Sequence, residues 1–232
     1  MSFIINPYQF GGAFSPDDIS GLYLWLKADA ITGLSNNDPV GTWIDSSAAG
    51  DDATQATSAE KPTYKTNTLN GLPVVSFDGG DALDSPASAA QKPFSHFAVV
   101  RVTDFDNYRQ IMNASGAGIN WRANITTGYP NLDKQGSVNI GTASSGPSAN
   151  TWAIWTITYS GSGDWVWYLD GSSVGSGTAD VTFNASTIRI GADPGYSYPF
   201  LGDLAEILCY DTVLSTGDRG DVTAHLQSKY AL

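Results

Sequence analysis

The chain has 232 residues, of which 41% are hydrophobic and 15% are charged, and its formal net charge is −12. A chain this negative repels the phosphate backbone of nucleic acids and the anionic headgroups of membranes, so we expect neither as a partner. No run of residues approaches the ~18 apolar residues of a membrane-spanning helix. The first residues also lack the basic region of a secretory signal peptide.

Residues 1–17 are expected to form an N-terminal arm outside the main domain. They carry large apolar side chains without periodicity, and Pro7, Gly11 and Gly12 disfavour a regular helix or strand. Such a segment is expected to cover a surface, either on its own domain or on a neighbouring subunit. The side chains that would make this contact are Phe3, Ile4, Ile5, Tyr8, Phe10 and Phe14.

Residues 18–232 have the pattern of one all-β domain. Short segments rich in β-branched and aromatic residues alternate with turn residues, and Asn70-Gly71 is the strongest hairpin signal. The pattern favours a β-sandwich. The predicted strands are residues 22–28, 42–45, 62–65, 72–77, 94–102, 110–113, 119–123, 137–141, 151–159, 165–169, a short strand near 174, 187–191 and 204–210.

The last predicted strand is an apolar run broken only by Glu206, which is typical of a strand buried on both faces. Ser215 and Asp218 then resemble a helix capping box, and Val222 and Leu226 give the following helix a narrow apolar face. The one cysteine, Cys209, lies in this strand, so we expect a buried, unreactive thiol.

Several segments resemble one known family. They are residues 20–29 (SGLYLWLKAD), 72–83 (LPVVSFDGGDAL), 167–177 (WYLDGSSVGSG), 187–193 (TIRIGAD) and 200–215 (FLGDLAEILCYDTVLS). Their order and spacing resemble the concanavalin A-like, laminin-G-like sandwich domains, and the first two are similar to a group found in structural proteins of tailed bacteriophages. The resemblance implies an all-β, two-sheet antiparallel jelly roll. Many members bind glycans, often with a calcium ion at one rim, and others are structural or assembly modules.

Glucanases share this fold and hydrolyse their substrates with paired carboxylates. The only glutamates are Glu60 and Glu206, and neither lies in the E-x-D-x-(x)-E pattern of those enzymes. Asp203 and Glu206 are three residues apart, which predicts that they face opposite sides of a strand. The only histidines, His96 and His225, offer neither a serine triad nor zinc spacing. We therefore expect a protein that is not an enzyme.

Turn aspartates are the candidate ligands for calcium. Asp104, Asp106 and Asn107 place side-chain oxygens at close spacing, although the glycine and distal glutamate of a calcium loop are missing. Asp78 and Asp81 lie in a second turn. The alternative is that these side chains accept bonds from their own backbone, as turn aspartates often do.

Glycan binding needs exposed aromatic faces beside polar side chains. The loop at residues 192–199 offers Tyr196, Tyr198 and Asp193, and these are the first candidates. The alternative is that the rings pack against the edge of the sandwich. The second set of candidates is Trp121, Tyr129 and Asn131.

These observations predict a non-enzymatic structural protein on the surface of a virion, as a capsid decoration or tail component made in the host cytoplasm. Its arm would contact other virion proteins, and its lectin-like domain would bind glycans. A glycan-binding adhesin or receptor-binding module is the alternative, and a carbohydrate-active enzyme is a weaker one. We therefore expect the protein to be a homo-oligomer or part of a larger assembly.

Overall fold

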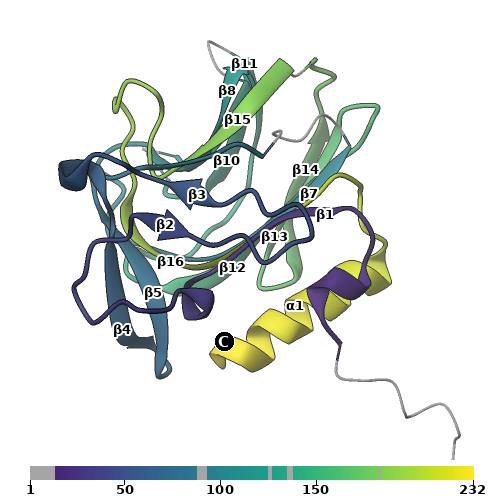
Figure 1. Cartoon of the computed structure of the whole chain (residues 1–232). Helices are drawn as coiled ribbons and strands as arrows, with labels where there is room; N and C mark the ends of the chain where they lie inside the picture. The colour runs from purple at the N-terminus through teal and green to yellow at the C-terminus, as the bar shows by residue number, and fades with distance from the viewer. Residues whose placement is uncertain (1–13, 88–92, 125–126, 135–137, 183) are drawn as a thin grey trace, which may run out of the picture.

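The computed structural model describes residues 14–87, 93–124, 127–134, 138–182 and 184–232, and these form a two-layered β-sandwich (Figure 1). All strand pairings among these residues are antiparallel, and one α-helix, α1 (Thr216–Tyr230), lies beside the sandwich. The predicted all-β jelly-roll sandwich with one C-terminal helix is therefore confirmed. Within the described residues, no helix is long and apolar enough to cross a membrane.

Sheet A has eight strands in the order β14-β13-β12-β7-β16-β5-β4, with β1 paired to β16 beside this path. Its inner face packs against sheet B, and its outer face carries α1. The strands are β1 (Leu22–Lys27), β4 (Thr63–Leu69), β5 (Leu72–Asp78), β7 (Phe94–Val102), β12 (Trp152–Tyr159), β13 (Asp164–Leu169), β14 (Ser172–Thr178) and β16 (Leu201–Tyr210).

Sheet B has eight strands in the order β11-β10-β9-β8-β15-β6-β3-β2. The strands are β2 (Thr42–Trp43), β3 (Ala53–Thr54), β6 (Leu83–Ser85), β8 (Arg109–Ala117), β9 (Ile119–Ala123), β10 (Pro130–Lys134), β11 (Val138–Thr142) and β15 (Asn184–Ile190). Three 3-10 helices, η1 (Pro16–Asp18), η2 (Ala28–Ala30) and η3 (Ser58–Glu60), occur in the connections. Strands β3, β6 and β10 were not predicted, because each is short and lacks a run of β-branched residues.

Strand β16 is the centre of sheet A and is buried on both faces, as predicted. Leu204, Ile207 and Cys209 point into the core between the sheets, whereas Ala205 and Leu208 point toward α1. The register shifts between Leu204 and Glu206, so Ala205 and Glu206 both lie on the helix side of a β-bulge. A strand that packs on two layers must be apolar almost throughout, which explains the run recognised in the sequence.

Helix α1 begins as the sequence predicts. The Ser215 hydroxyl caps the helix by accepting a 3.1 Å bond from the Asp218 backbone N–H. Val222 and Leu226 are fully buried and pack with Tyr230 on the outer face of sheet A. Because α1 covers sheet A, the outer face of sheet B is the sandwich face that no helix covers in the described part of the chain.

Candidate functional site

The outer face of sheet B carries polar side chains at alternate positions of β9 and β10. On β9, Ile119 and Trp121 point into the core, which turns Asn120 and Arg122 outward. On β10, Leu132 is in the core and Asp133 turns outward. Alternation along each strand thus builds a polar surface directly on a rigid hydrophobic layer.

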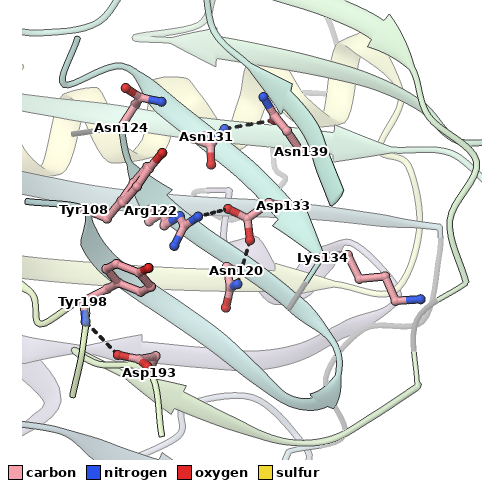
Figure 2. Close-up of a pocket in the computed structure, with 10 residues that line it drawn as sticks. All are labelled: Tyr108, Asn120, Arg122, Asn124, Asn131, Asp133, Lys134, Asn139, Asp193 and Tyr198. Atoms are coloured by element: carbon pink, nitrogen blue, oxygen red, sulfur yellow. Dashed lines mark hydrogen bonds and ion pairs between the residues drawn. The ribbon is translucent and has the colours of Figure 1, made fainter. Parts of the chain in front are cut away.

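A cleft of about 480 Å³ lies over these strands (Figure 2). Its floor comes from β9, β10 and β11, and its wall comes from the segment before β8 and the loop between β15 and β16. Ten side chains line it, and most are tyrosine, asparagine or charged: Tyr108, Asn120, Arg122, Asn124, Asn131, Asp133, Lys134, Asn139, Asp193 and Tyr198.

Two tyrosines and one arginine form the wall. The Tyr198 and Tyr108 rings meet edge to face, with centroids 5.4 Å apart. The Arg122 guanidinium lies 3.9 Å from the Tyr108 ring centroid and 4.9 Å from that of Tyr198. Tyr198 remains 37% exposed, so this ring is available to a ligand while the arginine supports it from below.

Asp133 organises the polar floor. Its carboxylate pairs with Arg122 Nη2 at 2.5 Å and accepts a 2.6 Å bond from Asn120 Nδ2. Asn120 in turn accepts a 2.5 Å bond from Asn113 Nδ2 on β8. Burial raises the pKa of Asp133, and its bonds to Asn120 and Arg122 offset part of this rise. The floor is therefore a pre-oriented network rather than a set of freely rotating side chains.

A second network fixes the amides at the other end of the cleft. Asn131 Nδ2 donates to Asn139 Oδ1 at 3.1 Å and to the Thr142 hydroxyl at 2.7 Å. Figure 2 shows this pair beside Asn124, above the ion pair of Arg122 and Asp133. Planar amides, one guanidinium and two phenols offer hydrogen-bond donors and acceptors at fixed positions. The charged lining residues are two cations and two anions, so their formal charges cancel.

Residues 77–218, which are more than half of the chain, match the Laminin_G_3 family of the concanavalin A-like lectin/glucanases superfamily. The chain belongs to this superfamily. No functionally curated protein matches the sequence.

Solved members of this fold resemble the chain in structure at low sequence identity. The fourth domain of AbnA, an extracellular arabinanase from Geobacillus stearothermophilus solved with arabinotriose, has a TM-score of 0.61 and 15% identity, with 87% of this chain and 98% of that chain covered. The binding domain of Paraclostridial Mosquitocidal Protein 1 has a TM-score of 0.63 and 11% identity, covering 91% and 53%. The ligand-binding domain of Botulinum neurotoxin serotype D, solved with N-acetylneuraminic acid, has a TM-score of 0.58 and 17% identity, covering 88% and 51%. At these identities the likeness concerns the fold, and the chain spans about half the length of the two toxin domains.

The concanavalin A-like sandwich brings three of the six candidate glycan residues into one cleft. Asp193, Tyr198 and Asn131 all line it. Tyr129 is half-buried next to Pro130, and its ring packs close to Gly146 and the core. Tyr196 turns elsewhere, because its hydroxyl donates a 2.9 Å bond to Glu60 on η3. The two loop tyrosines therefore do not stack together on one sugar.

Trp121 was wrongly assigned as a glycan candidate. Its side chain is fully buried and packs against Trp167, with ring centroids 6.2 Å apart. Its neighbours Asn120 and Arg122 are the outward residues of β9, so alternation forces the Trp121 ring into the core.

The calcium candidates lie in separate turns of this fold. Asp104 is paired with Arg109, and Asn107 donates a 3.3 Å bond to the Ser197 carbonyl. Asp106 is exposed, and its backbone N–H bonds to Asp104 at 3.1 Å. In the second turn, Asp81 accepts a 2.8 Å bond from the Asp78 backbone N–H, while Asp78 accepts one of 2.8 Å from Gly80. Across the described residues, no group of three or more His, Cys, Asp or Glu could hold a metal ion.

The carboxylates considered for hydrolysis are each bound to other side chains. The bulge in β16 places Asp203 and Glu206 on the same side of sheet A, which corrects the expectation from simple alternation. Asp203 is paired with Arg101 at 2.5 Å. Glu206 accepts bonds from Trp25, Lys229 and Tyr230 and is fully buried under α1.

Most cleft residues were not predicted from the sequence. Tyr108, Asn120, Arg122, Asn124, Asp133, Lys134 and Asn139 were all missed. The available signal was the polar residues spaced two apart in NWRAN and NLD, flanked by apolar ones. Of the predicted arm, Phe3, Ile4, Ile5, Tyr8 and Phe10 lie outside the described residues. Phe14 is described, and its ring contacts the His225 ring on α1 at a centroid distance of 6.0 Å.

Proposed function

We propose that this domain is a glycan-binding module and that the cleft on the outer face of sheet B is its binding site. The observation that carries the proposal is the exposed Tyr198 ring beside fixed amides and the Arg122–Asp133 pair. A sugar ring has an apolar face and a rim of hydroxyls. The tyrosine suits the apolar face, and the amide and guanidinium donors and acceptors suit the hydroxyls.

We propose that the cleft binds the glycan without hydrolysing it. A glycosidase needs two carboxyl groups that flank the bond to be cleaved, one of them as acid. The two carboxylates of the cleft have other partners, since Asp133 is bonded to Arg122 and Asn120, and Asp193 accepts a 2.8 Å bond from the Tyr198 backbone N–H. The superfamily supports a sugar ligand, and the arabinotriose and N-acetylneuraminic acid complexes of the similar structures support it by analogy.

A glycan array followed by calorimetry tests binding. Tyr198→Ala should lower the affinity for the best ligand by about 3- to 10-fold, the value of one aromatic contact, with an unchanged melting temperature. The matched control is Tyr168→Ala, because Tyr168 also has an arginine over its ring, Arg219 at 3.9 Å, but lies on sheet A. Absence of any glycan ligand for the wild type would refute the proposal, as would equal losses in both variants. Release of reducing sugar from the bound glycan would refute the non-enzymatic part.

We also propose that the domain is displayed on a virion as a structural component that joins its assembly through residues 1–14. The support is the resemblance of residues 20–29 and 72–83 to phage structural proteins and the apolar character of the first fourteen residues. Antibody labelling of purified particles tests the location. Deletion of residues 1–14 should leave the sandwich folded and abolish incorporation into particles. Normal incorporation of the truncated protein would contradict this role for the arm.

A further inference from the structure

One polar row crosses all eight strands of sheet B. Its members occupy directly paired register positions, so their side chains share one face of the sheet. Each member has at least one neighbour along its strand that packs into the core between the sheets. In sheet order the row is Asn139, Asp133, Asn120, Asn113, Arg189, Asp84, Thr54 and Thr42.

The cleft covers only the first part of this row. Beyond β8 the row continues through Arg189 and Asp84, which form a two-bond ion pair with both N–O distances at 2.8 Å. Between the two parts, Asn113 is fully buried, and its Oδ1 has no hydrogen-bond partner within the described structure. The loop at residues 191–200 lies along the start of β8, three residues before Asn113, since the Gln110 backbone N–H donates to the Tyr198 carbonyl at 3.3 Å.

The loop presents one tyrosine to each part of the row. In the cleft, Tyr198 lies over Arg122, which is paired with Asp133. In the other part, the Arg189 guanidinium lies 5.7 Å from the Tyr196 ring centroid and is paired with Asp84. The same three residue types, tyrosine, arginine and aspartate, are therefore repeated on the two sides of one loop.

A second hollow of about 570 Å³ accompanies the second set. Besides Arg189 and Asp84 it is lined by three hydroxyl side chains and two proline rings: Thr54, Ser85, Pro86, Thr187 and Pro194. Pro194 belongs to the same loop that supplies Tyr198 and Asp193 to the cleft. The hollow therefore shares an arginine–aspartate pair with the cleft and borders the same loop, and Tyr196 lies beside its arginine without lining it.

The position of Tyr196 is fixed at a cost in backbone energy. Its φ is +52°, a left-handed conformation that bulky side chains rarely adopt. The hydroxyl is held by Glu60, and burial with this bond raises the pKa of Tyr196 to about 12, which keeps the phenol a donor. A strained residue that is anchored at its far end is the arrangement expected where a side chain must keep one orientation.

We infer that the second hollow is a second subsite for the same glycan, so that the outer face of sheet B binds an oligosaccharide that crosses the loop at residues 191–200. The inference rests on the proposed function. Strands β9 and β15 are separated by β8 alone, and Arg122 lies two residues along β9 from Asn120, the row member, so the backbone positions of Arg122 and Arg189 lie roughly 12 Å apart. A ligand that reaches both must extend over several sugar units, and a single sugar fills one subsite only.

The length of the oligosaccharide is the variable that tests this inference. The probes are oligosaccharides of β-glucan, xylan, arabinan, mannan and chitin, each size-fractionated from two to eight units and titrated by calorimetry. For the glycan that binds, the wild-type affinity should rise by at least about 10-fold from the shortest to the longest probe, as expected when a second contact becomes intramolecular.

Two variants test whether the rise in affinity with oligosaccharide length depends on the second hollow. Thr54→Arg fills the hollow from β3 while leaving the sequence of the loop unchanged, and Tyr196→Asn removes the ring beside Arg189 with a residue that tolerates positive φ. Both should abolish the gain with length, and Thr54→Arg should leave the affinity for the shortest probe unchanged. Ser172→Arg on the exposed edge strand β14 of sheet A makes the same charge change and should keep the gain.

The outcomes separate the two proposals. If no probe binds the wild type at any length, the proposed function itself fails. If probes bind but the affinity is independent of length, or if Thr54→Arg keeps the full gain, glycan binding stands and the second subsite is wrong. A Thr54→Arg variant that loses short and long probes equally also overturns it, because the hollow would then act only through the structure of the cleft.

Discussion

The Glu206 carboxylate of β16 accepts a 2.8 Å hydrogen bond from the Tyr230 hydroxyl of α1, and both side chains are almost completely buried. The same carboxylate accepts bonds from Trp25 Nε1 at 2.5 Å and from Lys229 Nζ at 2.8 Å. One anion thus joins β1, β16 and α1. Burial, followed by the charge of Glu206, raises the pKa of Tyr230, so the phenol remains a hydrogen-bond donor.

Replacing Glu206 by Ala should lower the free energy of unfolding by about 3–5 kcal/mol, because Trp25 Nε1 and the Tyr230 hydroxyl lose this buried acceptor and Lys229 keeps Asp29 as its one acidic partner. Urea denaturation measures the change. Glu206→Gln should lose less, since its amide oxygen still accepts. A loss below about 1 kcal/mol for the alanine variant would show that α1 is held by its apolar contacts alone.

Arg122→Lys tests the geometry of the cleft wall. Lysine keeps the positive charge but lacks the planar fork that pairs with Asp133 and lies against Tyr108 and Tyr198. We expect about a 10-fold loss of glycan affinity by calorimetry, equal to ~1.4 kcal/mol, with the fold retained. Arg219→Lys, which faces Tyr168 on the other sheet, should leave the affinity unchanged. Equal affinity of Arg122→Lys and wild type would mean that only the charge matters.

Asp81 should make the protein less stable as the pH rises. Burial raises its pKa to about 6, and the nearby Asp78 carboxylate adds to this rise. A carboxyl whose folded pKa lies above its unfolded value of about 3.9 stabilises the fold below that value, and this contribution is lost as the pH rises toward 6.

The Asp81→Asn variant removes this titration while keeping an oxygen that accepts from the Asp78 backbone. At pH 7 it should be more stable than the wild type by about 1 kcal/mol after allowance for solvent screening, and the advantage should vanish near pH 4. Melting temperatures from pH 4 to 8 provide the measurement, with the exposed Asp106→Asn as control. A constant difference across this range would contradict the assignment.

Cys209 should resist alkylation in the native protein. The thiol is fully buried in β16, and this burial raises its pKa, so both access and the reactive thiolate are missing. Mass spectrometry after iodoacetamide treatment should find label only in denaturant, at the concentration where the sandwich unfolds. Rapid labelling in native buffer would mean that β16 opens locally.

The sequence predicted those parts of the fold whose signal is local. The apolar run of β16 and the capping serine of α1 each identify their element from a few neighbouring residues. Strand β10 has no such signal, because only one apolar residue lies between Pro130 and Lys134. This segment is a strand because it pairs with β9 and β11.

The candidate site was less predictable because it depends on register across strands. Asn113 and Asn120 are seven residues apart, and only the pairing of β8 with β9 places their amides together. The loop tyrosines were found from their exposure in a turn-rich segment, but their different orientations follow from distant partners, Glu60 for Tyr196 and Tyr108 for Tyr198. Trp121 could have been excluded by alternation within NWRA alone.

The central place of β16 in sheet A has a consequence for synthesis on the ribosome. Strands β1, β5 and β7 all pair with residues 201–210, so each emerges from the ribosome long before its partner exists. Sheet A therefore cannot close while the chain is being made, and folding must wait for almost the whole domain. During that interval β1, β5 and β7 lack a shared partner, and any stop codon or cleavage before residue 201 would leave sheet A without the strand that joins them.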